Sequence, residues 1–150
     1  MSNNPQPAAE RPADRTLVLL KPDAVRRALI GEILRRIEAK GYVIEALELR
    51  TADRELLAEH YGEHVGKPFY EPLLAFMSSG PVVAAIVSGQ RVIEGIRSLA
   101  GATDPTAAAP GSVRGDLGRD WGARVTENLI HASDSGESAA REIGLWFPVP

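Results

Sequence analysis

The order of apolar segments along the chain is the feature that most limits what it can fold into. A continuous apolar run at 16–20 is typical of a buried strand, and Pro22 ends it because proline cannot donate to a strand ladder. Apolar side chains then recur at helical spacing through 30–37, and Gly41 ends that helix. An alternating segment at 42–50 predicts a second strand. The folded region therefore begins as strand, helix, strand.

The rest of the chain continues this alternation. Asp53 and Ser135 are suited to cap helices, because their side-chain oxygens accept hydrogen bonds from unpaired backbone N–H groups. Further strands are predicted at 82–87 and 128–130, with another helix at 92–99 between them. Four strands, most of them separated by helices, predict an α+β sandwich of the βαββαβ kind. In that fold, helices cover one face of a four-stranded antiparallel sheet.

Composition divides the chain into a tail and one domain. Residues 1–14 contain three prolines and no large apolar residue apart from the initiator Met, which predicts a disordered tail. Residues 15–150 are enough for one domain with a single core. Within that domain, 101–127 is rich in Gly, Pro, Ala and Asp and predicts a long irregular loop. Such loops are functional or disordered, and because this one carries Arg114 and leads into His131, we expect an active-site loop.

Charge and cysteine content disfavour several classes of protein. The formal net charge is -3, which argues against a dedicated nucleic-acid binder, since neutralising phosphates requires a basic face. The chain has no cysteine, so disulfides, thiol nucleophiles and cysteine-bound metals are excluded. No apolar run approaches the roughly 20 residues that cross a membrane, and the N-terminus has no signal-peptide pattern. We therefore expect a cytoplasmic protein.

Two segments match known motifs without the context that those motifs need. Residues 62–68 are similar to a phosphate-binding P-loop, but the glycines are one residue too close and Pro68 replaces the hydroxyl residue that would bind magnesium. Residues 60–64 match the zinc-protease pattern H-x-x-E-H. A glycine inside this pattern weakens the helix that both histidines would share, and the sequence points to no third ligand. We interpret His60 and His64 as histidines near a helix end.

His131 is a candidate nucleophile. It lies at the edge of the apolar segment 128–130, beside small polar residues and before the last predicted helix. A nucleophilic imidazole needs one bare nitrogen and a partner that holds the proton on the other. Glu142 follows 11 positions later on that helix and is a candidate for this orienting role. Taken alone, the pattern slightly favours a structural histidine near a turn.

Three cationic residues occupy positions suited to phosphate binding. Lys21 directly follows the first strand, Arg97 lies on the helix at 92–99, and Arg114 lies in the glycine-rich part of the long loop. Phosphoryl transfer depends on positioning and on charge stabilisation, so it needs several such donors around one phosphate. Taken singly, each of these residues is more often a solvated surface side chain.

Several segments together resemble one family, the nucleoside diphosphate kinases. The matching segments are KPDAV at 21–25, GEI at 31–33, HY at 60–61, KPFY at 67–70, SGPVV at 79–83, GSVRGD at 111–116, HASDS at 131–135 and EIGLWF at 142–147. Each segment is weak evidence by itself. The ordered set, which runs from about Thr16 to Phe147 and includes the histidine of H-x-S-D-S, is highly specific.

The resemblance implies a ferredoxin-like core and a ping-pong transfer of the γ-phosphate of a nucleoside triphosphate to a nucleoside diphosphate, through phosphorylated His131. It also implies that Ser133 and Glu142 support His131, that Lys21 shares in catalysis, and that the ring of Phe69 stacks on the base. Magnesium would be carried mainly by the nucleotide phosphates, ATP and GDP among them, and not by a metal site of the protein. The residues expected to contact phosphate, ribose or the catalytic histidine are Lys21, Tyr61, Arg97, Thr103, Arg114 and Asn128.

The chain departs from the family pattern just before Asn128. Thr126-Glu127 stands where the family usually has Gly-Arg, and the stretch 117–127, which includes Trp121, is a few residues longer than usual. Smaller changes are Asp104 for a common asparagine and Ala132 for a frequent glycine. We expect the placement of Asn128 to be the most affected. The resemblance further implies a homo-oligomer, a tetramer or hexamer built from dimers.

Two other functions are compatible with the predicted fold but have less support in the sequence. A binding or regulatory protein of the same fold that has lost activity would be expected to lose His131 or Lys21, and both are present. Only the altered 117–127 stretch supports that alternative. A nucleic-acid-binding sheet would use aromatic residues as a stacking platform, and the acidic balance and an aromatic content of 5% argue against it.

Overall fold

The apolar run at the start of the folded region forms β1 (Asp14–Leu20), a strand inside the sheet. The structure is a computed structural model that describes residues 14–149. Apart from Asp14, at which β1 begins, the predicted tail lies outside the described residues. All apolar side chains of β1, from Leu17 to Leu20, are fully buried, as an uninterrupted apolar run requires.

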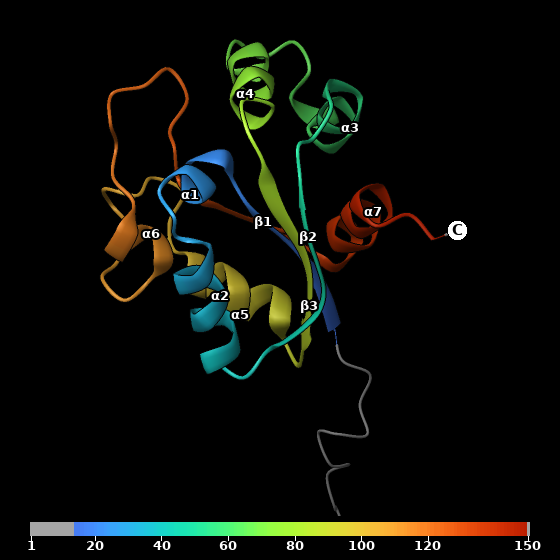
Figure 1. Cartoon of the computed structure of the whole chain (residues 1–150), viewed down its shortest axis with the longest axis vertical. Helices are drawn as coiled ribbons and strands as arrows, with labels where there is room; N and C mark the ends of the chain where they lie inside the picture. Colours follow the sequence, from blue (N-terminus) through green and yellow to red (C-terminus); the bar gives the residue numbers. More distant parts are fainter. Residues whose placement is uncertain (1–13, 150) are drawn as a thin grey trace, which may run out of the picture.

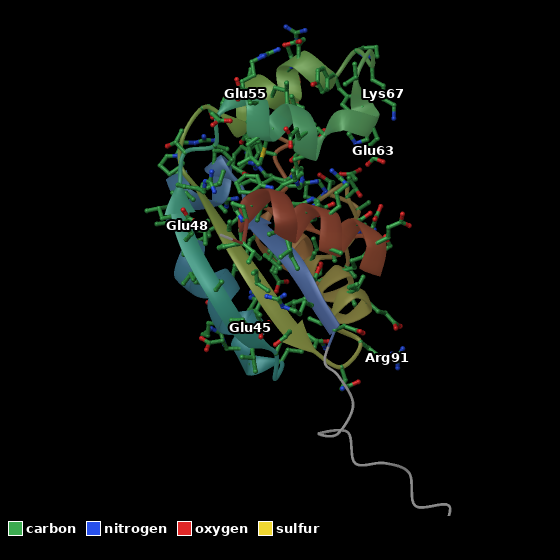
Figure 2. All side chains as sticks on the ribbon, turned by 90° about the vertical axis from the view of Figure 1, so that its right-hand side faces the viewer. Glu45, Glu48, Glu55, Glu63, Lys67 and Arg91 are labelled. Carbon is green, nitrogen blue, oxygen red and sulfur yellow. The ribbon has the colours of Figure 1, made fainter. Side chains whose placement is uncertain are left out.

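Four strands form one sheet within residues 14–149, and each neighbouring pair is antiparallel. The strands are β1, β2 (Val43–Arg50), β3 (Val82–Gly89) and β4 (Ile130–Ala132). Their order across the sheet is β2-β3-β1-β4. Figure 2 shows β2, labelled at Glu45 and Glu48, along one edge, followed by β3 and β1. The predicted α+β, ferredoxin-like sandwich with a four-stranded antiparallel sheet is confirmed.

Short helices connect the strands in the predicted order. They are α1 (Pro22–Arg26), α2 (Ile30–Ala39), α3 (Arg54–His60), the 3-10 turn η2 (Gly62–His64), α4 (Tyr70–Met77), α5 (Val92–Ala100), α6 (Val113–Leu117) and α7 (Gly136–Trp146). Both predicted caps form. The carboxylate of Asp53 accepts from the Leu56 N–H at 2.8 Å, and the hydroxyl of Ser135 accepts from the Ser138 N–H at 3.0 Å.

Helices cover both faces of the sheet, so the expectation of helices on one face was wrong. Val18 and Leu20 of β1 point into a core shared with α2 and α5, whereas Leu17 and Leu19 point into a second core shared with α3, α4 and α7. Figure 1 shows α2 and α5 on one side of the strands and α7 on the other. The cause is the continuous apolar sequence of β1 and β3, which leaves both faces in need of cover.

The fourth strand begins two residues later than predicted, because Leu129 interrupts it. Leu129 has a φ of +71°, in the left-handed region that a branched side chain rarely adopts. Its N–H donates to Asp23 Oδ2 at 3.1 Å, and its carbonyl accepts from the Lys21 N–H at 2.8 Å. These bonds from the turn after β1 hold the unusual conformation, and β4 then includes His131, which pairs with Leu19 of β1.

The long segment expected to be irregular contains one short helix, α6. Ser112 caps it by accepting from the Gly115 N–H at 3.0 Å. A Cβ at Gly115 would lie 1.9 Å from the carbonyl oxygen of Ala109, so only glycine fits this turn. The helix fixes the position of Arg114, whereas 118–129 has no helix or strand. No helix among residues 14–149 has the length and apolar character needed to cross a bilayer.

Candidate active site

A cavity of about 370 Å³ opens where α3, α5, α6, β4 and α7 meet. It collects side chains that are far apart in the sequence. Eight of the residues expected to act on a nucleotide line it: Lys21, Tyr61, Arg97, Thr103, Arg114, Asn128, His131 and Glu142. The other two predicted site residues lie elsewhere, Ser133 behind the cavity wall and Phe69 outside the lining.

His131 is held by a carboxylate from α7. Its Nε2 lies 2.7 Å from Glu142 Oε1, and Glu142 is almost fully buried on α7. Because an ionised carboxylate only accepts hydrogen bonds, the neutral imidazole carries its proton on Nε2 and leaves Nδ1 bare. Burial lowers the pKa of His131, with smaller effects in the same direction from Lys21 and Arg114, while the bond to Glu142 opposes the shift. The neutral ring with one bare nitrogen is the state that a nucleophile needs.

Ser133 fixes the carboxylate that fixes His131. Its hydroxyl donates to Glu142 Oε1 at 3.0 Å and accepts from the Leu17 N–H at 3.2 Å. Ser133 is completely buried, so this chain of bonds is shielded from water. The β1 backbone, Ser133, Glu142 and His131 thus form one connected arm that sets the orientation of the imidazole.

Three cations face the cavity from different elements. Lys21, Arg97 and Arg114 come from the turn after β1, from α5 and from α6. None of them forms an ion pair with a carboxylate within residues 14–149. Burial lowers the pKa of Lys21 to about 8, helped by Arg114 and opposed by Asp23. Burial, with a smaller effect from Arg97, lowers the pKa of Arg114 to about 10. Cations that form no direct ion pair with a carboxylate favour an anionic ligand.

Arg114 also ties the long segment to β4. Its guanidinium donates to the carbonyls of Asn128 at 3.1 Å, Gly101 at 2.9 Å and Ile130 at 2.6 Å. Arg97 makes one long contact, 3.5 Å from its Nη1 to the Ala132 carbonyl. Most of the N–H donors of Arg114 are therefore bonded to backbone carbonyls. More of the N–H donors of Arg97 remain for a ligand.

Asn128 lies in the cavity despite the altered sequence in front of it. Its amide oxygen accepts from Lys21 Nζ at 2.8 Å, and its amide nitrogen donates to the Thr103 carbonyl at 3.0 Å. The extra length of the preceding stretch is accommodated on the surface. Trp121 there is half exposed, with the Arg119 guanidinium 3.7 Å from its ring centroid.

Two aromatic residues occupy different depths. The hydroxyl of Tyr61 is buried and has no hydrogen-bond partner among the described residues, which leaves it available to a ligand. Burial, with a smaller effect from Glu142, raises the pKa of Tyr61, so the hydroxyl remains a donor. Phe69 is 45% exposed, and its ring lies 5.2 Å from that of His64, which does line the cavity. Phe69 therefore stands at the rim.

Sequence reasoning missed several residues of the lining, His60 above all. His60, Glu63, His64 and Asp134 also face the cavity. Figure 2 shows Glu63 on the segment between α3 and α4, near Lys67. His60 belongs to a matching segment of the family, but nothing local in the sequence indicates its role. Its hydrogen-bond partner, Trp146, is 86 residues away.

Two of the three potential metal ligands of the site are imidazole nitrogens. Across residues 14–149, the only group of histidine and carboxylate ligands is His60, His131 and Glu142, whose ligand atoms lie within 4.8 Å of one another. Magnesium prefers oxygen ligands and near-octahedral geometry. The group therefore does not suit magnesium, and His64, the second histidine of the protease-like pattern, is not part of it.

Comparison with known proteins gives consistent matches over nearly the whole chain. The sequence model described as "Nucleoside diphosphate kinase" matches residues 14–149. The chain is 68% identical over 137 residues to the nucleoside diphosphate kinase of Streptomyces avermitilis, covering 91% of this chain and 97% of the relative. It is 60% identical over 136 residues to that of Mycobacterium tuberculosis, covering 90% and 97%.

Solved structures match in the same way. A halophilic nucleoside diphosphate kinase from Halobacterium salinarum in complex with CDP has a TM-score of 0.86 and 44% identity, covering 92% of this chain and 90% of that one. A transition-state mimic of the nucleoside-diphosphate kinase from Borrelia burgdorferi, with bound vanadate and ADP, has a TM-score of 0.84 and 36% identity, covering 90% and 87%.

Proposed function

Since this chain belongs to the nucleoside diphosphate kinase family, we propose that His131 carries the phosphate that the enzyme moves from a nucleoside triphosphate to a nucleoside diphosphate. One observation carries the proposal. The imidazole of His131 is oriented by Glu142 at 2.7 Å and faces a cavity lined by three cations that lack carboxylate partners within residues 14–149. The relatives named as kinases and the presence of His131 and Lys21 leave no support for the inactive alternative.

We assign the attack to Nδ1 of His131, which is supported by the bond between Nε2 and Glu142. In the first step Nδ1 forms a bond to the γ-phosphorus while the bond from phosphorus to the bridging oxygen breaks, and the nucleoside diphosphate leaves. In the second step a terminal oxygen of another nucleoside diphosphate attacks that phosphorus, and the N–P bond breaks. The Nε2 proton stays in place, and Glu142 stabilises the positive charge that forms on the ring.

The cations and donors of the cavity stabilise the phosphoryl group in transfer. Lys21 and Arg97 supply positive charge to its oxygens, and the unpartnered hydroxyl of Tyr61 supplies a neutral donor. Arg114 holds the carbonyls of the loop and strand and adds positive charge at the same site. Such donors gain strength in a cavity that excludes water, and they need little reorganisation during the reaction.

Recognition of the nucleotide depends on its shared parts. We assign Asn128 and Thr103 to ribose and phosphate contacts, and Phe69 to stacking at the rim. A ring can stack on any base because every base has a π-face. Relatives bind CDP and ADP, one pyrimidine and one purine, which supports a site open to several nucleoside di- and triphosphates.

We assign magnesium to the substrate. The metal-ligand group among the described residues contains two imidazoles, which does not suit magnesium, so the ion arrives bound to the nucleotide phosphates. Magnesium on the phosphates neutralises part of their charge. The protein's own cations, Lys21, Arg97 and Arg114, complete that neutralisation.

The exposed edge of the sheet supports a homo-oligomer. β2 is an edge strand, and its apolar residues Val43, Leu47 and Leu49 are each more than half exposed. An apolar edge strand is a surface that a second copy can cover. A dimer through β2 is therefore the unit that we expect to build the tetramer or hexamer. A cytoplasmic location stays a prediction from the sequence.

A labelling experiment tests the proposal. The purified protein is mixed with magnesium and ATP labelled on the γ-phosphate, and unlabelled GDP is added afterwards. We expect acid-labile, base-stable label on the protein, which GDP removes as labelled GTP, and no label on His131→Ala. Turnover by His131→Ala at the wild-type rate would refute the role of His131.

A further inference from the structure

His60 is a buried residue of the site that the mechanism above leaves unused. It ends α3, is 3% exposed and lines the cavity beside His131. The centroids of the two imidazoles are 4.6 Å apart, with their planes at 74°. His60 is therefore close enough to His131 to contact a phosphoryl group bound to it.

Trp146 fixes which nitrogen of His60 carries the proton. Its indole Nε1–H donates to His60 Nδ1 at 3.0 Å, and both residues are buried. An indole N–H can only donate, so Nδ1 must be the bare nitrogen and the neutral ring carries its proton on Nε2. Burial, with smaller effects led by His131 and Arg141, lowers the pKa of His60 to about 2, so the ring stays neutral at working pH.

The same bond argues against a metal ion at this place. His60, His131 and Glu142 together have the composition of a metal site. Ligation through His60 Nε2 would require the proton to move to Nδ1, where it would face the indole N–H of Trp146. The arrangement therefore offers a hydrogen-bond donor, and not a metal ligand.

The remaining donor of His60, Nε2–H, has no partner among the described residues. Within residues 14–149, the one hydrogen bond of the His60 ring is that of Nδ1 with Trp146, and no acceptor bonds to Nε2. Nδ1 is bonded to Trp146 and His60 lines the cavity, so Nε2 is the ring nitrogen that remains for a ligand. Phosphoryl oxygens gain negative character during transfer and are strong acceptors.

We propose that His60 is a further catalytic residue, whose Nε2–H donates to a non-bridging oxygen of the phosphoryl group carried by His131, and that Trp146 sets its tautomer. The proposal rests on the proposed role of His131. A neutral donor helps here because it stabilises the transferring group without adding a fourth charge beside Lys21, Arg97 and Arg114. Trp146 is then a positioning residue, which acts only through His60.

Rapid-quench labelling of the full-length protein with magnesium and γ-labelled ATP tests this role. Removal of one preorganised donor predicts that His60→Phe phosphorylates His131 roughly 10- to 100-fold more slowly, with the nucleotide concentration at half-saturation nearly unchanged. His60→Gln can place an amide N–H near the Nε2 position, and we expect it to be faster than His60→Phe. Leu57→Val, on the same helix as His60 and in the core that contains Trp146, is the control and should keep the wild-type rate.

The variants separate a catalytic role from packing. If His60 only fills space, the ring of phenylalanine should be milder than the flexible glutamine, and that order of rates would overturn the proposal. Trp146→Phe keeps an aromatic ring but loses the N–H, and we expect a rate below that of the wild type. The double variant should be no slower than His60→Phe alone. A wild-type rate for folded Trp146→Phe would also overturn it.

Two results distinguish this proposal from the one beneath it. Absence of label on the wild-type protein would refute the proposed function, and the role of His60 with it. Normal labelling of the wild type, together with an equal rate for His60→Phe, would refute the role of His60 alone. Unfolding temperatures of all variants show which rates come from folded protein.

Discussion

Replacing Glu142 by glutamine removes one charge from the arm that orients His131. Oε1 of Glu142 lies 2.7 Å from His131 Nε2 and 3.0 Å from the Ser133 hydroxyl, and a glutamine oxygen can accept both bonds. A charge-assisted bond contributes about 1.5–3 kcal/mol and a neutral one about 0.5–1.5 kcal/mol. The difference of about 1–1.5 kcal/mol corresponds to a loss of roughly 10-fold in phosphorylation rate. Glu142→Ala loses the whole bond. Its phosphorylation rate should fall by roughly 10- to 100-fold relative to the wild type.

The pH profile gives this prediction a sign. Glu142 raises the pKa of His131 against the stronger lowering by burial. The nucleophile must be neutral, so activity is lost as pH falls through the pKa of His131. Removing the carboxylate lowers that pKa, and the acid limb of the rate profile should therefore move to lower pH in Glu142→Gln.

Stopped-flow or rapid-quench rates across pH measure both effects. Glu137→Gln makes the same charge change on an exposed part of α7 and should leave rate and profile unchanged. A wild-type rate for Glu142→Gln, or an acid limb that moves to higher pH, would refute the orienting role of Glu142.

Three further predictions concern Lys21, Asp23 and Trp121. Folding lowers the pKa of Lys21 from 10.5 to about 8, so the unfolded chain holds more protons between these values and the Lys21 contribution to the free energy of unfolding rises with pH there. Lys21→Met should remove that rise in denaturant titrations and abolish turnover. Asp23→Ala removes the acceptor for the Leu129 N–H and should cost roughly 1–3 kcal/mol of stability, whereas Asp23→Asn, which keeps an acceptor, should lose less in the same titration. Trp121→Ala changes a half-exposed surface side chain and should alter stability by less than about 0.5 kcal/mol and leave steady-state kinetics unchanged.

Local patterns were sufficient for most of the fold. The apolar runs at 16–20 and 82–87 became the central strands, and Asp53 and Ser135 cap the helices they were expected to cap. Helices on both faces of the sheet could have been predicted from the same runs, since an uninterrupted apolar strand has no polar face to leave in water. The start of β4 could not be predicted from local sequence, because Leu129 has a left-handed conformation that is held by Asp23, 106 residues away.

In the site, too, some residues could be identified from the sequence and others could not. Residue type and spacing, together with the family resemblance, identified His131 and Glu142, and the structure joins them by a direct bond. Asn128 reaches the cavity because Lys21 and the Thr103 carbonyl hold its amide, contacts that its altered neighbours do not disturb. The role of His60 depends on Trp146, and a partner 86 residues away leaves no local pattern.

The position of the phosphate on His131 tests the account most directly. With ¹⁵N-labelled histidine, the one-bond coupling between phosphorus and nitrogen in the phosphorylated protein identifies the atom that carries the group. The bond between Nε2 and Glu142 predicts coupling to Nδ1 of His131, with Nε2 still protonated, and no signal from His131→Ala. Coupling to Nε2, or to another residue, would contradict the arrangement in which Glu142 holds one nitrogen so that the other can attack.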